Sequence, residues 1–504
     1  MGQSHMRHAL PPGVDGAAGN YPLTQIWVHG RNTGTYPVSG FTVVNSQKRS
    51  GGNLMSTVDP RTKEKLWNAP VAGEADLDDA VLAAREAFKT WKVVPVQERQ
   101  ACLSRLADEL DARREEIHGI LSKETGKSGL LTNIEIDDTL KYIRFNASHS
   151  LPDEVEYEDE TLKIISTHPP IGVVGAICPW NFPLVLAVAK IAAALVMGNC
   201  IIVKPSPFTP YATLKFAELA ISIFPPGVFQ ALNGDNDVGR LMTLHPGIDK
   251  ITFTGSTATG RKVAESATKT LKRVTLELGG NDASIICPDV DVQSVAQKVA
   301  TGCLFHSGQM CVATKRVYVH KDIFEEFRDA LVKAVNATEI DKSGHQPSLF
   351  GPIQNQMQYD VVKGLIADSK SNGHTFLSGG DSEEQPGLFI RPCVIDRPPD
   401  DSKIIKMEQF GPIIPLMEWT SEDEVISRVN DTESGLGSCV WARNTTTAER
   451  IARKLEVGSV WINSFEIPSP YGYFSGWKQS GIGGEWGRQG LLSYSQTQTL
   501  QIYK

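Results

Sequence analysis

The sequence predicts an α/β protein built around a parallel, doubly wound sheet. From about residue 172, short apolar runs with the length of strands alternate with segments of helical periodicity. Such alternation is typical of parallel sheets whose two faces are covered by helices. After about residue 280 a second α/β block begins. Because the chain has 504 residues and single cores rarely grow past roughly 250–300 residues, we expect more than one domain.

Two amphipathic helices are predicted ahead of this region. The first covers residues 74–91, and its apolar face consists of Leu77, Val81, Ala84, Phe88 and Trp91. The second covers residues 98–127, and its stripe consists of Leu103, Leu106, Leu110, Ile117 and Leu121. Gly126 is expected to end the second helix, because glycine readily adopts the left-handed conformation found at helix ends.

The alternating region contains four strand-and-helix pairs. The strands are expected in GVVGAI, CIIVK, GVFQAL and DKITFTG, because these are short apolar runs. The helices are expected over about 184–197, within 210–224, near 236–244 and over 257–268. A further apolar run, RVTL, predicts a strand that leads to Glu277.

In the second block, TKRVYVH indicates a strand. Asp322 and Glu325 have the spacing of a capping box, which predicts the start of the next helix. Residues 369–387 are rich in Gly and Ser and predict a surface loop. The tail is rich in Tyr, Thr and Gln, which suits an edge strand that pairs with another element or with another subunit.

Composition narrows the class of protein. Hydrophobic residues make up 41% of the chain and charged residues 21%, as in ordinary globular proteins. The net charge of -8 argues against nucleic acids or anionic membranes as general partners. The sequence has no apolar run of about 18 residues, so no transmembrane helix is expected. Residues 1–20 are interpreted as a flexible arm or as the remnant of an expression tag.

The cysteines and histidines are not spaced as metal ligands. The eight cysteines include no CxxC pair, and the histidines form no HExxH motif. We therefore expect no metal site. The thiols are expected to be reduced, which favours a location in the cytoplasm.

Three polar features follow predicted strands, where ligands bind in open α/β sheets. Residues 255–260, GSTATG, open a helix whose N-terminus could hold phosphate, although they match neither a Walker A loop nor a GxGxxG fingerprint. Asn181, in PWNFP, offers an amide donor for an oxyanion. Lys204 could bind a ribose hydroxyl or a phosphate. Each feature also has a structural interpretation, as a tight turn, a helix cap and a solvated lysine.

Two further residues have the chemistry of covalent catalysis. Glu277 lies in LELGGND, and a carboxylate among apolar neighbours tends to have the raised pKa that a general base requires. A turn glutamate is the alternative. Cys311, which follows FHSGQM, could be a nucleophile if a base or a positive charge activates it. Considered alone, Cys311 is more simply explained as an inert buried thiol.

These segments, in this order, resemble those of the aldehyde dehydrogenase superfamily from about residue 40 to residue 504. The matching segments are CPWNFP, VKPSPFTP, FTGSTATG, LELGGND, GQMC, EQFGPI, GSVWIN and SGWKQSGIGGEWG. The resemblance implies an NAD(P)-dependent enzyme of the hydrolytic type, which oxidises a small aldehyde to a carboxylic acid.

The resemblance also implies a role for four matching residues. Cys311 stands at the position of the nucleophile, and Glu277 at that of the base that activates water. Asn181 stands in the oxyanion hole, together with the backbone N–H of Cys311. Lys190 matches a lysine proposed to relay protons. Relatives that transfer the acyl group to coenzyme A usually lack the base, so Glu277 favours hydrolysis. A non-catalytic relative would lack one of the first three residues.

The resemblance implies a cofactor site formed by Ile177, Trp180, Lys204, Gly255, Ser256, Glu277, Leu278, Gly279, Glu408 and Phe410. Glu408 matches the carboxylate on the nicotinamide ribose, and Lys204 the lysine on the adenosine ribose. Many NAD-preferring relatives carry glutamate where this chain has Pro207. Proline can neither bind the ribose hydroxyls nor repel a 2′-phosphate. NAD is therefore the expected cofactor, and NADP remains an alternative.

The implied substrate tunnel is formed by Phe182, Leu186, Ala189, Met310, Val312, Phe465 and Glu466. Most of these residues are apolar, which favours an apolar aldehyde. Ala189 is small where several relatives carry tryptophan, so a wide tunnel is expected. Glu466, at the expected mouth, disfavours an anionic substrate.

The resemblance completes the expected architecture. It implies a Rossmann-type cofactor domain over 21–149 and 171–279 and an α/β catalytic domain over 280–490. Residues 150–170 and 491–504 would form a small β oligomerisation element, so a homodimer or a homotetramer is expected.

Overall fold

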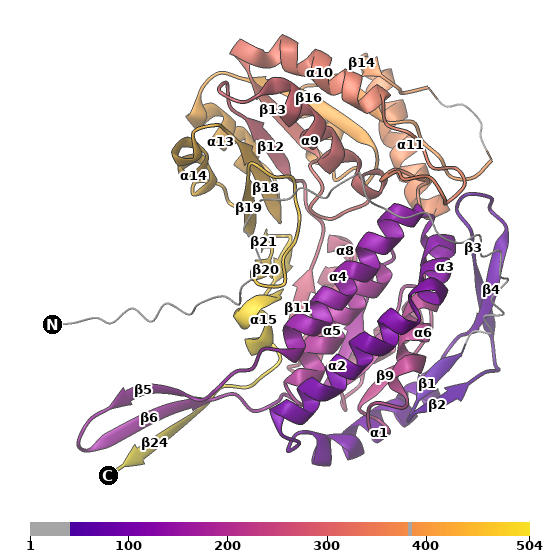
Figure 1. Ribbon diagram of the computed structural model, residues 1–504, viewed down its shortest axis with the longest axis vertical. Helices are drawn as coiled ribbons and strands as arrows, with labels where there is room; N and C mark the ends of the chain where they lie inside the picture. The colour runs from indigo at the N-terminus through magenta and orange to yellow at the C-terminus, as the bar shows by residue number, and fades with distance from the viewer. Residues whose placement is uncertain (1–40, 382–385) are drawn as a thin grey trace. The chain divides into compact units, whose positions relative to one another are not determined.

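The structure is a computed structural model that describes residues 41–381 and 386–504 (Figure 1). The arm expected over residues 1–20 and the first twenty residues of the expected cofactor domain, 21–40, lie outside the described residues. Two sheets, of eight and seven strands, organise the described chain. The two α/β blocks predicted from the sequence are therefore confirmed.

The first sheet has a parallel centre with antiparallel edges. Its order is β2-β1-β9-β8-β7-β10-β11-β22, and the five strands from β9 to β11 in this order are parallel. Its strands are β1 (Thr42–Val44), β2 (Gln47–Arg49), β7 (Val173–Ile177), β8 (Cys200–Lys204), β9 (Phe229–Ala231), β10 (Lys250–Thr254), β11 (Arg273–Glu277) and β22 (Gly481–Ile482). Strand order reverses beside β7, so the predicted doubly wound sheet is confirmed. The antiparallel edge strands were not expected.

Helices connect the parallel strands. They are α5 (Pro183–Val196), α6 (Tyr211–Ala220), α7 (Asn236–Leu244) and α8 (Thr257–Thr268). Right-handed crossovers place α5 and α6 on one face of the sheet and α7 and α8 on the other. All four predicted helices are confirmed, although α6 ends four residues before the predicted limit.

The helices ahead of this region differ in part from the prediction. They are α1 (Glu74–Trp91), α2 (Val96–Ala112), α3 (Arg114–Thr125) and α4 (Gly129–Ala147). The single helix predicted over 98–127 is wrong: Arg113 leaves the helical conformation at φ -106° and ψ 19° and separates α2 from α3. Gly126 does end α3, with φ 74°. The sequence analysis missed α4, whose buried face includes Thr132, Glu135 and Thr139, which weaken its apolar pattern.

The second sheet has the order β14-β15-β16-β13-β12-β18-β19 and is parallel except at β14. Its strands are β12 (Ala283–Ile286), β13 (Arg316–His320), β14 (Thr375–Ser378), β15 (Cys393–Asp396), β16 (Ile413–Trp419), β18 (Gly437–Trp441) and β19 (Ser459–Ile462). Its helices are α9 (Val292–Leu304), η1 (Phe305–Gly308), η2 (Lys321–Ile323), α10 (Phe324–Asn336), α11 (Gln356–Ser371), α12 (Lys403–Lys406), α13 (Glu422–Asn430) and α14 (Thr445–Ala452).

Two local predictions in this block are wrong. The capping box of Asp322 and Glu325 does not form, because a short 3-10 turn precedes α10 and the His320 side chain accepts the Asp322 N–H instead. The loop predicted over 369–387 begins inside α11 and contains β14, which pairs with β15. The many Gly and Ser residues of this segment favour a loop, so the sequence did not indicate the short strand β14.

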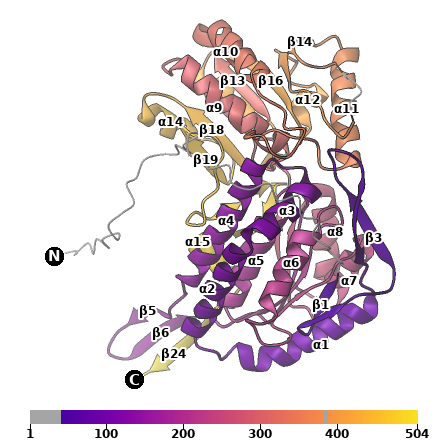
Figure 2. The ribbon, with the colours of Figure 1, turned by 45° about the vertical axis from the view of Figure 1, so that its right-hand side comes forward.

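Smaller sheets complete the fold. They are formed by β3 (Leu54–Val58) with β4 (Lys65–Pro70), β17 (Ser434–Gly435) with β21 (Trp477–Lys478), and β20 (Phe474–Ser475) with β23 (Gly484–Glu485), next to α15 (Gly487–Leu492). A three-stranded sheet has the order β24 (Gln498–Tyr503), β6 (Leu162–Thr167) and β5 (Glu154–Glu158). The expected pairing of the tail is confirmed, and Figure 2 shows this sheet at the periphery.

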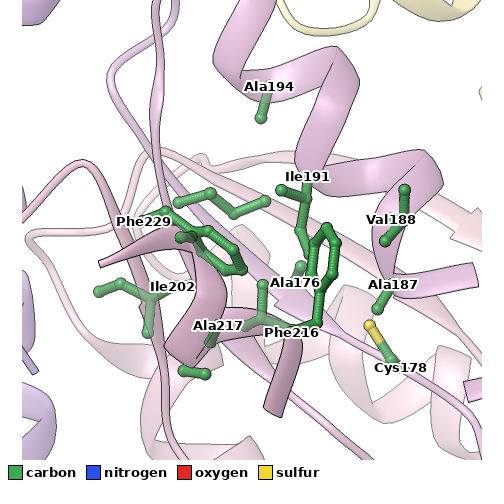
Figure 3. Close-up of a cluster of buried hydrophobic side chains, with 14 of the residues drawn as sticks. Ala176, Cys178, Ala187, Val188, Ile191, Ala194, Ile202, Phe216, Ala217 and Phe229 are labelled. Carbon is green, nitrogen blue, oxygen red and sulfur yellow. The ribbon is translucent and has the colours of Figure 1, made fainter. Parts of the chain in front are cut away.

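An apolar core fixes α5 and α6 against the first sheet. Figure 3 shows side chains of β7, β8 and β9, such as Ala176, Ile202 and Phe229, facing those of α5 and α6, such as Ile191 and Phe216. This packing positions the loop between β7 and α5. Among the helices of the described ranges, none combines the length and the apolarity needed to cross a bilayer.

Candidate active site

Neighbouring strands of the first sheet end at the candidate site. Ile177, at the end of β7, lies beside Lys204, at the end of β8. Thr254, at the end of β10, lies beside Glu277, at the end of β11. Asn181 follows β7 in the next loop. The structure therefore brings these residues to one edge of the sheet, beside the point where strand order reverses and where ligands bind in such folds.

The chain turns sharply ahead of Cys311. His306, Ser307 and Gly308 have successive positive φ angles of 51°, 59° and 74°, which non-glycine residues rarely adopt. The Ser307 hydroxyl and the Gln309 amide donate hydrogen bonds to main-chain carbonyl groups. The turn thus has one strongly determined conformation, as is common where a reactive side chain must be held in place.

Asn181 lies against this turn. Its Nδ2 atom donates a hydrogen bond of 3.0 Å to the carbonyl oxygen of Gln309, two residues before Cys311. An amide has two N–H donors, so the same side chain can also meet an oxyanion that forms at Cys311. The structure therefore brings Asn181 to the segment that carries Cys311.

Glu277 is buried, with an exposed fraction of 4%. Its Oε1 atom has no hydrogen-bond partner among the described residues. Burial raises the pKa of Glu277 well above its ordinary value, the Glu485 carboxylate adds to this rise, and the Lys190 ammonium opposes it. A carboxylate with a raised pKa and an unpaired oxygen has the properties of a general base.

Glu485, which the sequence analysis did not single out, connects Lys190 to the site. The Lys190 ammonium donates hydrogen bonds of 2.5 Å to Glu485 and 2.8 Å to the Thr254 hydroxyl. The Thr252 hydroxyl donates a further bond of 2.7 Å to the same Glu485 oxygen. Glu485 lies in SGWKQSGIGGEWG, one of the segments on which the family resemblance rests. The sequence alone did not indicate that its side chain contacts Lys190.

The surroundings of Cys311 keep its thiol protonated in the absence of a base. Burial raises the pKa of Cys311 to about 12, and the Lys315 ammonium opposes this rise, while the Glu277 carboxylate adds to it. Cys311 packs beside an apolar cluster of Val312, Leu436 and Phe474. Activation of this thiol therefore requires a base or a positive charge near the sulfur.

Lys204 lies in the part of the site expected to bind the adenosine ribose. Its side chain is buried, and its ammonium donates a hydrogen bond of 3.2 Å to the Pro205 carbonyl. Burial lowers the pKa of Lys204 to about 8. A buried amine with one carbonyl partner suits a ligand that supplies further acceptors, such as ribose hydroxyls or phosphate.

The N-terminus of α8 supplies the anion-binding element. Ser256 is its N-cap, and its hydroxyl accepts a hydrogen bond from the Thr259 N–H. Gly255 precedes it, and the N–H groups of such a turn suit a pyrophosphate. Leu278 packs beneath α8, where a side chain at Gly260 would lie 2.4 Å from its Cδ2 atom.

Glu408 lies at the other end of the expected cofactor site. It accepts a hydrogen bond of 3.2 Å from the Gly280 N–H, and a Cβ at Gly279 would lie 2.2 Å from its Oε2 atom. A larger residue at position 279 would therefore displace the Glu408 carboxylate from this position. Phe410 makes an edge-on contact with Trp180, with ring centroids 5.3 Å apart. An anion-binding turn, a buried amine and a carboxylate together fit a nicotinamide dinucleotide.

Aromatic rings dominate the expected substrate side. Phe182 stacks on Phe305 with centroids 6.2 Å apart, and Phe305 contacts Phe465 at 6.4 Å. Met310 and Val312 flank Cys311. Leu186, one of the expected residues of α5, is half-buried. The side chains described so far on the expected substrate side are therefore apolar.

The structure differs from two expectations on this side. Ala189 does not open a wide space, because the rings of Tyr142 and Trp486 line the small cavity beside it. Glu466 is not at a solvent-facing mouth. It is buried at 2% exposure and accepts a hydrogen bond of 2.5 Å from the Thr314 hydroxyl. Sequence spacing alone does not reveal which face of the loop after β19 points inward.

A comparison with known proteins decides the family. The family model described as "Aldehyde dehydrogenase family" matches residues 46–500. The chain belongs to this family. The aldehyde dehydrogenase fold is thereby confirmed, and the chain is an oxidoreductase that acts on aldehydes.

Individual aldehyde dehydrogenases agree with this assignment. Aldehyde dehydrogenase LUC3 from a Fusarium species is 41% identical over 92% of this chain and 98% of its own length. Human retinaldehyde dehydrogenase 3 is 35% identical over 90% of both chains. The NAD+ complex of an aldehyde dehydrogenase from Bacillus cereus has a TM-score of 0.90 and 34% identity, and covers 92% of this chain and 97% of its own.

Within residues 41–381 and 386–504, no group of three or more His, Cys, Asp and Glu side chains could hold a metal ion.

Proposed function

We propose that this aldehyde dehydrogenase oxidises an apolar aldehyde to a carboxylic acid through a thioester on Cys311. The proposal rests chiefly on one observation: Asn181 donates a hydrogen bond to the Gln309 carbonyl oxygen, two residues before Cys311, and Glu277 ends a neighbouring strand at the same edge of the sheet. A nucleophile, an oxyanion donor and a base are thus combined, as covalent acyl chemistry requires.

The first half of the reaction forms the thioester. The Cys311 thiol transfers its proton to a base, and its sulfur attacks the aldehyde carbonyl carbon to give a thiohemiacetal. Asn181 and the backbone N–H of Cys311 stabilise the oxyanion. Bound NAD supplies the electron acceptor that this oxidation needs. Loss of hydrogen and its electron pair from the thiohemiacetal carbon leaves a thioester on Cys311.

The second half releases the acid. Glu277 takes a proton from a water molecule, whose oxygen attacks the thioester carbon. The carbon–sulfur bond breaks, which releases the carboxylic acid and regenerates the Cys311 thiolate. The proton then leaves Glu277 towards the Lys190–Glu485 pair, which is the buried hydrogen-bonded route beside it. An enzyme that transfers the acyl group to coenzyme A would need no such base.

NAD is proposed as the preferred cofactor, with NADP also accepted. The Pro207 side chain carries no polar atom, so it can neither bind ribose hydroxyls nor repel a 2′-phosphate. Lys204 is buried at the end of β8, and its ammonium can pair with either a hydroxyl or a phosphate. Acceptance of NADP therefore rests on the absence of a repelling charge rather than on a dedicated phosphate site.

We also propose a homodimer or a homotetramer in a reducing compartment such as the cytoplasm. Every residue of β24 is exposed. Val155, Leu500 and Ile502 expose 55%, 39% and 45% of their surfaces on the same three-stranded sheet, and apolar patches of this kind mark interfaces. All eight cysteines are free, which suits a reducing environment.

A panel of aldehydes, assayed separately with NAD and NADP, tests this function. Apolar aldehydes should be oxidised to free acids, and added coenzyme A should neither raise the rate nor appear in the product. Acyl-coenzyme A as the product would overturn the hydrolytic mechanism. The Cys311→Ala variant should bind NAD but form no reduced cofactor.

A further inference from the structure

A buried lysine holds the loop of Cys311 from within the protein. The Nζ atom of Lys315 donates hydrogen bonds to the carbonyl oxygens of Met310 at 3.1 Å, Cys311 at 2.6 Å and Ala313 at 3.0 Å. The residue is only 3% exposed. Three acceptors match the three N–H donors of an ammonium group, whereas a neutral amine has only two. Lys315 therefore holds a positive charge directly beneath the nucleophile.

The same ammonium faces the carboxylate of the expected cofactor site. Its Nζ atom lies 3.7 Å from the Glu408 Oε1 atom. Burial raises the pKa values of Glu408, Asp282 and Glu466, and Lys315 opposes the rise in each of the three. Lys315 is thus the cation shared by the buried acidic groups and by the Cys311 loop.

We infer that Lys315 is a positioning residue that stabilises the Cys311 thiolate and ties the nucleophile loop to Glu408. The inference rests on the proposed function, because it takes Cys311 as the nucleophile and Glu408 as a cofactor ligand. The charge acts through space on the sulfur, and the three carbonyl contacts fix the main chain on both sides of it. Removal of Lys315 should therefore weaken both thiolate formation and cofactor binding.

The purely structural alternative is that Lys315 only fixes the main chain of the Cys311 loop through its three hydrogen bonds. The two roles differ in what a change of charge does. Lys315→Met keeps the apolar stem and removes the charge, whereas Lys315→Arg keeps the charge. Lys315→Gln retains N–H donors without a charge and provides a second neutral variant if Lys315→Met does not fold. Lys298→Met, at an exposed position on α9, is a matched control for loss of one positive charge.

Alkylation of Cys311 measures the charge effect without turnover. Each variant of the full chain is treated with neutral iodoacetamide and, separately, with anionic iodoacetate at one pH. The modified peptides are then quantified by mass spectrometry. The half-buried Cys102, on α2, is the internal control because it should react alike in all variants.

We expect iodoacetamide to modify Cys311 about three- to thirtyfold more slowly in Lys315→Met. The thiolate fraction falls about tenfold for each unit of pKa, and higher intrinsic nucleophilicity recovers part of the loss. The ratio of the iodoacetate rate to the iodoacetamide rate should fall about fivefold or more, because an anionic reagent loses its attraction to the ammonium. Lys315→Arg should recover most of this ratio, and Lys298→Met should leave it unchanged.

If the ratio of the iodoacetate rate to the iodoacetamide rate were unchanged in folded Lys315→Met or Lys315→Gln, the inference would be overturned. Lys315 would then only fix the main chain of the loop. The Michaelis constant for NAD should also rise in both neutral variants, and an unchanged value would remove the link to Glu408. Alkylation does not depend on catalysis. If Cys311→Ala proved active, the proposed function would fail while the alkylation result still reported the coupling of Lys315 to Cys311.

Discussion

The Lys190 ammonium donates a hydrogen bond of 2.5 Å to the Glu485 carboxylate, and the side chains are 0% and 2% exposed. Burial disfavours the ammonium, but the Glu485 and Glu277 carboxylates together hold the pKa of Lys190 above its ordinary value. Desolvation makes such a pair a poor source of stability compared with apolar packing. Its presence beside Glu277 agrees with the route proposed above for the proton.

Loss of one member of this pair should destabilise the fold strongly. We expect Glu485→Gln to lower the free energy of unfolding by about 3–5 kcal/mol, because it leaves Lys190 buried without a counter-charge. Lys190→Met combined with Glu485→Gln should cost less than Glu485→Gln alone. Denaturant titration measures both. Glu449→Gln, which breaks an exposed pair with Arg453, should change stability by less than about 1 kcal/mol. Equal losses for the buried and exposed pairs would contradict this account.

Removal of the base should separate the two halves of the reaction. In Glu277→Gln we expect the first turnover to produce reduced cofactor, while steady-state turnover falls by about 10²–10⁴-fold, because the thioester is no longer hydrolysed efficiently. The wild-type rate of hydrolysis should rise with pH through the raised pKa of Glu277, since its ionised form is the base. Stopped-flow measurements across pH should show that this rise in the hydrolysis rate is absent from Glu277→Gln. If the rate of Glu277→Gln still rose with pH in the same way, the base would be another group.

Cofactor choice should respond to a charge at position 207. Pro207→Glu adds a carboxylate at the position expected from the family resemblance to face the adenosine ribose, and juxtaposed like charges cost several kcal/mol. We expect the ratio of kcat/KM for NADP to that for NAD to fall at least about tenfold. Pro207→Gln, which adds a polar group without charge, is the control. A ratio that falls equally in both variants would mean that charge is not the cause.

Assembly should depend on the exposed apolar residues of β24. Leu500→Arg combined with Ile502→Arg puts charges on one face of this strand, and we expect the assembly to dissociate towards the 55.0 kDa chain. Gln501→Arg, on the other face of the strand, should leave the mass unchanged. Light scattering distinguishes the two results. A stable monomer in the unmodified protein would remove the proposed assembly altogether.

The parallel sheet could be predicted because short, mainly apolar runs such as VVGAI and CIIVK alternate with segments of helical periodicity. The break between α2 and α3 could not, because the apolar stripe from Leu103 to Leu121 continues across Arg113. The edge strands of the first sheet are two or three residues long and carry no distinctive pattern. Tertiary pairing, rather than local propensity, determines such short elements.

Cys311, Asn181 and Glu277 were expected in the candidate site because the motifs around them match those of the family, whereas each motif alone also allowed a structural interpretation. The site was not predictable where partners come from distant parts of the chain. Lys190 and Glu485 are 295 residues apart in sequence. The rings that line the space beside Ala189 likewise come from α4 and from the segment before α15. Only the three-dimensional structure brings these groups together.

The most direct test of the account is to look for the acyl group on Cys311. Glu277→Gln is mixed with NAD and an apolar aldehyde, quenched in acid within the first turnover, and digested for peptide mass spectrometry. The account predicts about one equivalent of reduced cofactor per site, together with an acyl group on the peptide that contains Cys311 and on no other. Reduced cofactor formed without acylation of Cys311, or formed equally well by Cys311→Ala, would contradict it.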